Sequence, residues 1–277
     1  MSQAIPILTY HRIDNDGLST STEPATFGQH MNWLADHGWR SLTTNEFAFY
    51  ANRQNKFPAK SFLLTFDDGY ESVASNAFPV LKDLNFHSIC FVATRHMRQS
   101  GSHPGSSSTD DANFLTWEQL RNLQASGLME VHSHTHAHAQ STDYTESQLK
   151  ADLTTSLDLL STELALPRTC FRHLAWPWGY SNDTSREIAR KAGFRYQYTV
   201  SRSAYLSSSP LEDIPRTCYD GATLVNFTAQ LRLQCGPLSG LWHAAYPLMR
   251  RVRHAPVRSF LRQRAASSNA ASEIEPV

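Results

Sequence analysis

The sequence lacks a net charge, a long apolar run and a charged leader segment. Its 25 basic and 25 acidic residues cancel, so overall charge does not favour a nucleic acid as partner. No run of about 18 apolar residues occurs, so no membrane-spanning helix is predicted. The opening residues, MSQAIPILTYHRID, contain no charged stretch followed by a long apolar one, so we expect a cytoplasmic protein without a secretion signal.

Cysteine is scarce and dispersed. The four cysteines include no CxxC pair, which excludes a disulfide framework or zinc finger and suits a reduced compartment. With 40% hydrophobic and 11% aromatic residues, the chain can bury one large core. We therefore predict one large folded domain at residues 1–235 and a basic, partly apolar tail at residues 236–277. The cysteines are Cys90, Cys170, Cys218 and Cys235.

Short apolar segments alternate with longer segments of helical period, which predicts a parallel sheet with crossover helices. Residues 99–113, rich in Gly, Ser and Asp, are predicted to form a surface loop. We expect strands at residues 5–10, 39–42, 61–66, 87–92, 129–133, 170–175 and 196–201. We expect helices at about residues 26–37, 44–53, 74–84, 116–127, 145–164 and 183–192.

Two adjacent carboxylates follow the apolar strand SFLLTF predicted at residues 61–66. Asp67 and Asp68 come at its carboxyl end, and Gly69 lets the chain turn away. In parallel α/β folds, functional sites form at that end of the strands. A solvated turn is the alternative interpretation.

Four histidines occur in the seven residues His132–His138. On a continuing strand all four would share one face, whereas a helical turn after Ser133 would bring only His134 and His138 together. Two imidazoles one turn apart, with a carboxylate from a neighbouring strand end, form a typical metal-ligand set. A polar loop that binds metals nonspecifically is the alternative.

Large aromatic residues surround a Pro and a Gly directly after the strand predicted at residues 170–175. Aromatic rings can cover the apolar face of a sugar, and Gly179 would let a backbone N–H approach a substrate oxygen. Packing in the core is an equally weighted alternative. The candidate substrate-binding residues are Trp176, Trp178, Gly179 and Tyr180.

These motifs resemble those of the NodB-type polysaccharide deacetylases, carbohydrate esterase family 4. The resemblance rests on Thr65–Gly69, His134-Thr135 with His138, and Trp176–Gly179, and extends over roughly residues 5–233. It implies a distorted (β/α) barrel of about seven parallel strands. It also implies that Asp68, His134 and His138 bind a divalent metal, usually zinc, and that Asp67 is the catalytic base. His132 and His136 have no matching role in the family.

Two departures from the family pattern affect the catalytic assignments. Ala175 and Trp176 stand where the family carries an arginine. The stretch Ile214–Arg216 resembles one in a subgroup with the same substitution, which implies that Arg216 supplies that charge from another strand end. The usual C-terminal Leu-x-His motif is absent from its expected place, and Leu241–His243 is a decoy. The first strand, with Leu8–Arg12, instead resembles the circularly permuted subgroup that includes the poly-N-acetylglucosamine deacetylases. That resemblance makes His11 the candidate general acid.

The predicted reaction is metal-dependent hydrolysis of N-acetyl groups on an amino-sugar polysaccharide or its lipid-linked precursor. By resemblance, the backbone N–H of Trp178 would help to stabilise the oxyanion. An O-acetyl esterase, a hydrolase of non-sugar amides and a catalytically silent carbohydrate-binding protein remain alternatives. A silent binding protein would not need Asp67, Asp68, His134 and His138 together.

The tail from Leu238 to Arg264 mixes apolar and basic residues without one acidic residue. This composition is typical of an interfacial segment, so contact with an anionic membrane at the inner face is predicted. A solvated helical tail, or a face packed on the barrel or on a second subunit, are the alternatives. The residues in question are Leu241, Trp242, Tyr246, Leu248, Met249, Val252, Phe260, Leu261, Arg250, Arg251, Arg253, Arg258, Arg262 and Arg264.

Overall fold

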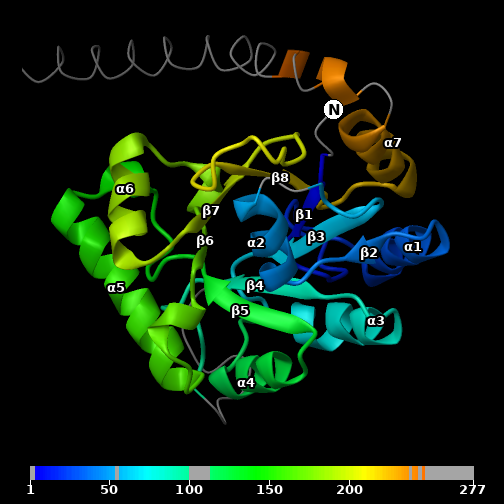
Figure 1. Ribbon diagram of the computed structural model, residues 1–277. Helices are drawn as coiled ribbons and strands as arrows, with labels where there is room; N and C mark the ends of the chain where they lie inside the picture. Colours follow the sequence, from blue (N-terminus) through cyan, green and yellow to red (C-terminus); the bar gives the residue numbers. More distant parts are fainter. Residues whose placement is uncertain (1–3, 54–55, 100–112, 237–238, 243–244, 247–277) are drawn as a thin grey trace, which may run out of the picture.

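The computed structural model describes residues 4–53, 56–99, 113–236, 239–242 and 245–246. Its strands form a closed parallel barrel in the order β1-β8-β7-β6-β5-β4-β3, which closes where β1 pairs with β3 (Figure 1). A short strand, β2, pairs with the first two residues of β3. The predicted barrel of seven parallel strands is thus confirmed. The strands are β1 (Ile7–Tyr10), β2 (Arg40–Ser41), β3 (Ser61–Phe66), β4 (Ser88–Val92), β5 (Met129–Ser133), β6 (His173–Ala175), β7 (Tyr196–Val200) and β8 (Ile214–Cys218).

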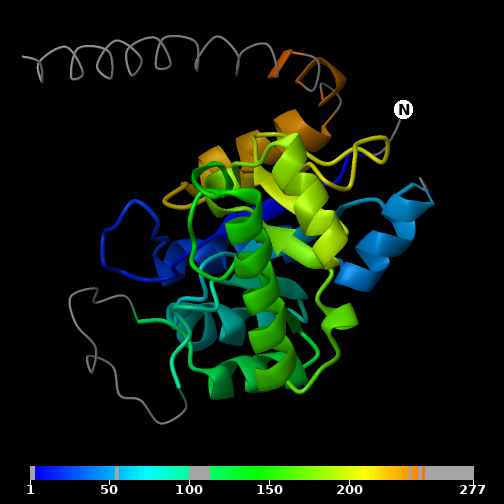
Figure 2. The ribbon, with the colours of Figure 1, turned by 90° about the vertical axis from the view of Figure 1, so that its left-hand side faces the viewer.

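Helices surround the barrel, and Figure 2 shows α5 and α6 lying along its outer face. Four of them begin with a reciprocal capping box, including α4, where Thr116 and Gln119 form it. In the described part of the chain, no helix combines the length and apolarity needed to cross a membrane. The helices are α1 (Pro24–Asp36), α2 (Thr44–Asn52), α3 (Phe78–Asp83), α4 (Trp117–Ala125), α5 (Glu146–Glu163), α6 (Asp183–Ala192) and α7 (Leu224–Cys235), with short turns η1 (Val73–Ala77), η2 (Ser141–Asp143), η3 (Arg168–Cys170) and η4 (Pro177–Gly179).

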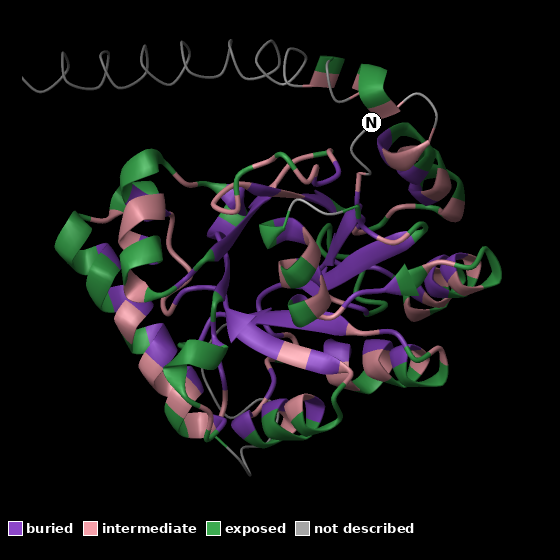
Figure 3. Ribbon diagram, viewed as in Figure 1, coloured by how far each residue is buried: buried purple, intermediate pink, exposed green. Residues whose placement is uncertain are grey.

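Most residues of the barrel strands are buried, as Figure 3 shows in purple. In β3, Phe62 and Leu64 belong to the cluster that packs under the surrounding helices, whereas Leu63 belongs to a second cluster. The second cluster also includes Phe47 of α2, whose ring packs against Tyr198 of β7. Because both faces are covered, β3 is a continuous apolar run rather than an alternating one.

Two differences from the predicted elements concern β6 and the last βα unit. The strand expected at residues 170–175 begins only at His173, because a 3-10 turn at Arg168–Cys170 follows Pro167. Neither β8 nor α7 was predicted as a full element. Pro215 interrupts the strand pattern of β8, although it pairs in register with Thr199.

Most of the predicted tail, including all of residues 247–277, lies outside the described residues. Residues 100–112 of the loop predicted at residues 99–113 also lie outside them. Two aromatic residues assigned to the tail are described. Trp242 donates its indole N–H to the carbonyl oxygen of Arg202 at 2.8 Å, and Arg202 donates its backbone N–H to Tyr246 Oη at 3.0 Å. These two aromatic residues therefore contact the segment that follows β7. The domain boundary at residue 235 coincides with the end of α7 and stays a prediction.

His30 on α1 makes stability sensitive to acid. Its side chain is fully buried, its Nδ1 lies 2.9 Å from Tyr10 Oη, and its ring stacks on Phe227. Burial lowers its pKa from 6.5 to about 4, so the unfolded chain binds this proton more readily than the folded one. The stabilising contribution of neutral His30 is complete above about pH 6.5. We expect the free energy of unfolding to decrease by roughly 2–3 kcal/mol as pH falls towards 4.

Replacing His30 by Gln, which keeps a polar partner for Tyr10 but cannot titrate, should flatten this pH dependence. The free energy of unfolding by urea, compared between about pH 7 and about pH 4.5, measures the effect. His37→Gln, on an exposed residue of the same region, is the matched control and should retain the wild-type slope. An unchanged slope in His30→Gln would contradict the assignment.

Candidate active site

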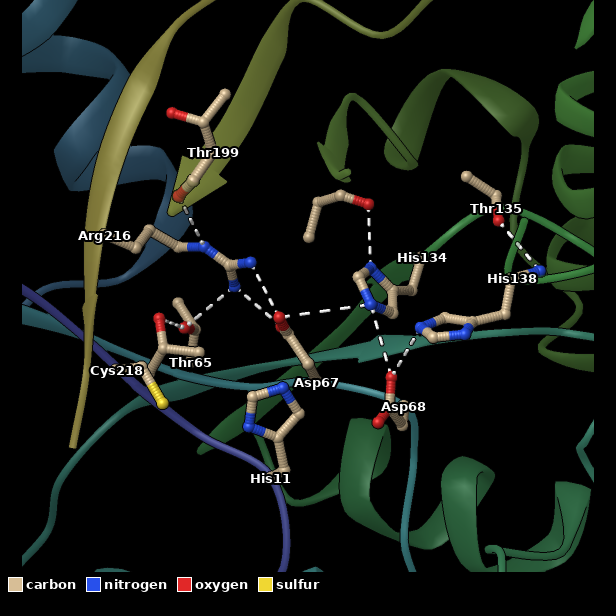
Figure 4. A network of polar contacts seen from close by, with 12 residues as sticks. His11, Thr65, Asp67, Asp68, His134, Thr135, His138, Thr199, Arg216 and Cys218 are labelled. Atoms are coloured by element: carbon tan, nitrogen blue, oxygen red, sulfur yellow. Dashed lines mark hydrogen bonds and ion pairs between the residues drawn. The ribbon is translucent and has the colours of Figure 1, made fainter. Parts of the chain in front are cut away.

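The site lies at the carboxyl end of the barrel, where the turn after β3 separates the two aspartates. The backbone N–H of Asp67 still donates to the carbonyl of Tyr10 on β1 at 2.9 Å, whereas Asp68 has a φ of 71° and Gly69 a φ of 83°. A Cβ on Gly69 would meet the side chain of Met97 at 2.7 Å. This strained turn sends the two carboxylates in different directions, Asp67 towards Arg216 and Asp68 towards the histidines (Figure 4).

His134 and His138 converge on one oxygen of Asp68. Their Nε2 atoms lie 3.3 and 3.1 Å from Asp68 Oδ1. The chain after β5 is an irregular loop rather than the helical turn considered from the sequence, since Thr135 and His138 have positive φ. The structure nevertheless brings His134 and His138 together, the same pair that was expected from a helical turn.

The carboxylate of Asp152, on α5, holds this loop in place. It accepts the backbone N–H groups of His136 and Ala137 at 2.8 and 2.9 Å. Sequence reasoning missed Asp152, because nothing in the helical pattern of α5 distinguishes an acidic residue that faces a loop from one that faces solvent. The role of Asp152 is to position the histidine loop.

The atoms at this point fit a divalent cation. The carbonyl of Ala175 can only accept, so His134 donates from Nδ1 at 2.8 Å, and the Nε2 of the neutral ring is then an acceptor facing Asp68. Asp68 Oδ1 is itself buried without a hydrogen-bond donor. Facing acceptors repel each other unless a cation lies between them, and two imidazoles with one carboxylate suit zinc.

The environment keeps Asp68 ionised. Burial alone would raise the pKa of its carboxyl group, but His134 and His138, when a proton rather than an ion lies on their Nε2 atoms, outweigh burial and lower that pKa well below its usual value. A ligating carboxylate must be deprotonated, so this residue meets the first requirement for metal binding.

Arg216 of β8 forms a buried two-point ion pair with Asp67. Its Nη1 and Nη2 atoms lie 2.6 and 2.7 Å from the two carboxylate oxygens. Nη1 also donates to the hydroxyl of Thr65, and the guanidinium lies 5.3 Å from the ring centroid of Phe91. The guanidinium therefore lies beside Asp67 as predicted, but Arg216 is the middle residue of β8 rather than its end, and its catalytic role stays a prediction.

This pairing determines the charge of Asp67. Burial raises the pKa of its carboxyl group, but Arg216 and the nearby His134 more than compensate and hold the pKa below its usual value. Asp67 is therefore an ionised carboxylate, 4.0 Å from His134 Nε2. Each oxygen used by Arg216 keeps a further lone pair that can accept a proton.

His11, directly after β1, is held by Asp220. Its backbone N–H donates to Asp220 Oδ1 at 3.0 Å, and its Nδ1 lies 2.5 Å from Oδ2. Burial lowers the pKa of this imidazole, but hydrogen bonds to Asp220 and Cys218 and the charges of Asp220 and Asp67 raise it well above 6.5 overall. His11 is therefore an imidazolium at neutral pH, as a general acid must be.

A family model described as polysaccharide deacetylase matches residues 54–197, which are 144 of the 277 residues of the chain. The chain belongs to the polysaccharide deacetylase family. It is an enzyme, a hydrolase of the class predicted from its motifs.

Similarity extends to deacetylases with named substrates. The poly-beta-1,6-N-acetyl-D-glucosamine N-deacetylase of Staphylococcus aureus (strain MSSA476) is 28% identical over 201 residues, which cover 71% of this chain and 67% of the relative. The enzyme of the same name from Staphylococcus epidermidis is 29% identical over 232 residues and 76% of each chain.

Solved structures share the fold of this deacetylase. IcaB from Ammonifex degensii is 25% identical with a TM-score of 0.70, and the match covers 85% of this chain and 98% of that one. The Streptococcus pyogenes deacetylase PplD, solved in complex with acetate, has a TM-score of 0.71 at 22% identity, with 83% and 99% covered. The second similarity shows the fold alone.

The aromatic turn of the deacetylase divides into buried and exposed residues. Trp178 and Tyr180 are 53% and 49% exposed, and the ring of Trp178 lies 4.6 Å from that of His138. Trp178 and Tyr180 are thus available to a glycan. Their roles as substrate-binding residues stay predictions.

The substrate-binding predictions for Trp176 and Gly179 do not fit the structure. Trp176 is fully buried in the core and donates its indole N–H to Gln197 at 3.1 Å. Gly179 is buried, its N–H already donates to the carbonyl of Trp176, and a Cβ there would lie 2.3 Å from the backbone nitrogen of Val200. Both residues shape the turn from within, since the backbone N–H of Trp176 still donates to the carbonyl of Tyr198 on β7 at 3.0 Å.

The other two histidines of the cluster point elsewhere. His136 Nδ1 lies 2.9 Å from the hydroxyl of Thr94. His132 is buried, with its ring 4.7 Å from that of His173. Neither belongs to the group of possible ligands formed by Asp68, His134 and His138.

We therefore expect single alanine variants to separate these histidines by metal content. Asp68→Ala, His134→Ala and His138→Ala should each lose the ion that wild-type protein retains after gel filtration, because three protein ligands are the minimum for a catalytic zinc site. Elemental analysis of the folded variants measures this. His132→Ala and His136→Ala are the controls and should retain the ion; the reverse pattern would overturn the ligand assignment.

Proposed function

We propose that this polysaccharide deacetylase hydrolyses the N-acetyl groups of a poly-β-1,6-N-acetylglucosamine glycan, as part of exopolysaccharide synthesis. The observation that carries the proposal is the convergence of an ionised base, Asp67, an imidazolium, His11, and a three-ligand cation site at one barrel mouth. The names of the staphylococcal relatives support the choice of glycan.

The cation proposed at Asp68, His134 and His138 is zinc, which when bound would polarise the acetyl carbonyl and make a water more acidic. Asp67 accepts a proton from the attacking water while the water oxygen bonds to the acetyl carbon. Arg216 keeps Asp67 oriented and ionised before that step. The backbone N–H of Trp178 is the proposed donor to the developing oxyanion.

Collapse of the tetrahedral species breaks the carbon–nitrogen bond. His11 donates its proton to the departing amine, because an unprotonated amine is a poor leaving group, and Asp220 stabilises the ring through the transfer. The products are acetate and a free amino sugar. The exposed rings of Trp178 and Tyr180 are proposed to hold the neighbouring sugars.

Acetate release from two substrates tests the choice of bond. An N-acetylglucosamine oligomer with β-1,6 linkages is compared with an O-acetylated oligosaccharide at equal concentration of acetyl groups. We expect faster release from the N-acetylated oligomer. Faster release from the O-acetylated one would favour an esterase and overturn the proposal.

Contact with the inner face of an anionic membrane is also proposed, for a cytoplasmic enzyme that acts on a lipid-linked precursor. The basic and apolar composition of residues 238–264 supports it, since each basic residue near such a surface contributes about 1 kcal/mol. We expect full-length protein to co-sediment with anionic liposomes in a salt-sensitive manner and a truncation after Cys235 not to. Equal absence of binding in both would remove the membrane from the proposal.

A further inference from the structure

A second group of metal-ligating side chains lies beside the general acid. His11, Cys218 and Asp220 each offer a ligand atom, and these atoms all lie within 4.8 Å of one another. Cys218 Sγ lies 3.0 Å from Asp220 Oδ2, the oxygen that also contacts His11 Nδ1. Figure 4 shows His11 and Cys218 on the side of Asp67 away from His138.

The register of the barrel fixes this group. Strands β1 and β8 are paired in parallel, with Thr9 opposite Cys218. His11 and Asp220 each lie two residues beyond this pair and therefore leave the sheet side by side. The backbone N–H of Tyr219 donates to the carbonyl of Thr9 at 2.9 Å. The hydrogen bonds between β1 and β8 therefore hold the three possible metal ligands near one another, and no loop has to close around an ion.

In the deacetylation steps only His11 and Asp220 transfer or stabilise a proton, and Cys218 contributes no more than a hydrogen bond to His11. Asp220 orients His11, but the thiol of Cys218 has no part in binding acetate, water or amine. Cys218 is exposed, so an ion can reach the group from solvent. Nitrogen, sulfur and carboxylate oxygen together are a donor set suited to zinc.

We propose that His11, Cys218 and Asp220 form a second binding site for a zinc-like cation, and that occupation of this site inhibits the enzyme. The inhibition rests on the proposed role of His11 as general acid. A cation at Nδ1 takes the lone pair that holds a proton in the imidazolium, and one proton from His11 and one from Cys218 pass to solvent. The ligated ring keeps an N–H at Nε2 that is far less acidic, so the departing amine is not protonated.

The second site should fill after the first. Ligands must lose their protons to bind a metal, and the thiol of Cys218 holds a proton that it donates to Asp220 Oδ2 at 3.0 Å. At the first site, Asp68 Oδ1 is buried without a hydrogen-bond donor and lies 3.3 Å from His134 Nε2, so no such hydrogen bond has to be broken there. The enzyme is therefore active with one ion and inhibited by excess.

Titration of the metal-free full-length protein with Co²⁺ tests the site without reference to activity. Only the second site contains sulfur, so a thiolate-to-cobalt charge-transfer band in the near ultraviolet should appear with the second equivalent, not the first. Cys218→Ser should abolish the band. Cys170→Ser, on another exposed thiol, should retain it. No band in the wild type at excess cobalt, or a band that persists in Cys218→Ser, would overturn the site.

Deacetylation rates at increasing free Zn²⁺ test the consequence. Wild type should be activated by the first equivalent and then inhibited, whereas Cys218→Ser should need at least about tenfold more zinc for the same inhibition. Equal inhibition of both proteins would overturn the inhibitory role. If no substrate is hydrolysed at all, the proposed function fails, yet the cobalt band still decides whether the second site exists.

Discussion

Asp67→Asn is expected to reduce turnover by about a hundredfold or more while leaving metal content unchanged. The amide has nearly the shape of the carboxylate but cannot accept a proton from water. Asp67 points to Arg216, whereas Asp68 faces the two histidines. The substitution therefore removes the base and spares the ligands. Steady-state kinetics with elemental analysis of the same preparation measures both.

Asp68→Asn is the matched control for Asp67→Asn, since it changes the adjacent carboxylate in the same way. It should lose the ion as well as the activity, because an amide oxygen is a much weaker ligand than a carboxylate. An Asp67→Asn protein that turned over at the wild-type rate, or that lost its ion as Asp68→Asn does, would refute the division of roles.

Arg216→Met should destabilise the protein by about 3–5 kcal/mol, because it leaves the buried Asp67 without its counter-charge. Both side chains of this pair are almost completely buried, at 0% and 3% exposure. The loss should be greatest at neutral pH and shrink in acid, since an unpaired buried carboxylate takes up a proton more readily. The free energy of unfolding by urea measures it.

The double variant Asp67→Asn/Arg216→Met isolates the cause. Removing the carboxylate charge should recover a substantial part of the stability lost in Arg216→Met alone. Arg40→Met, in an exposed pair with Glu46, is the control and should change stability by about 1 kcal/mol or less. A double variant no more stable than Arg216→Met would attribute the loss to packing instead.

The residues of the catalytic centre could be predicted where one short motif contains them. The apolar strand before Asp67 and Asp68, and the spacing of His134 and His138, are local features of the sequence. Arg216 was reached only through a family resemblance, since its contact with Asp67 spans 149 positions. Neither propensity nor periodicity encodes such a contact.

The residues that were overlooked or assigned a wrong role have physical explanations. Asp220 escaped notice because Pro215 interrupted the pattern of β8, and without that strand the residue two positions beyond its end could not be placed beside His11. Trp176 was predicted to bind substrate, with packing in the core as an equal alternative, because sequence cannot tell where β6 stops pairing with β7. Its backbone N–H still donates to the carbonyl of Tyr198 at 3.0 Å, which directs the indole into the core.

The most direct test of the account measures free amino groups formed from a defined β-1,6-linked N-acetylglucosamine oligomer. Full-length protein is assayed after chelation and again after one equivalent of zinc is restored, beside His134→Ala treated in the same way. We predict that chelation abolishes amine formation and that zinc restores it in the wild type only. Undiminished activity of the chelated protein, or equal restoration of His134→Ala, would contradict a metal-dependent N-deacetylase built on Asp68, His134 and His138.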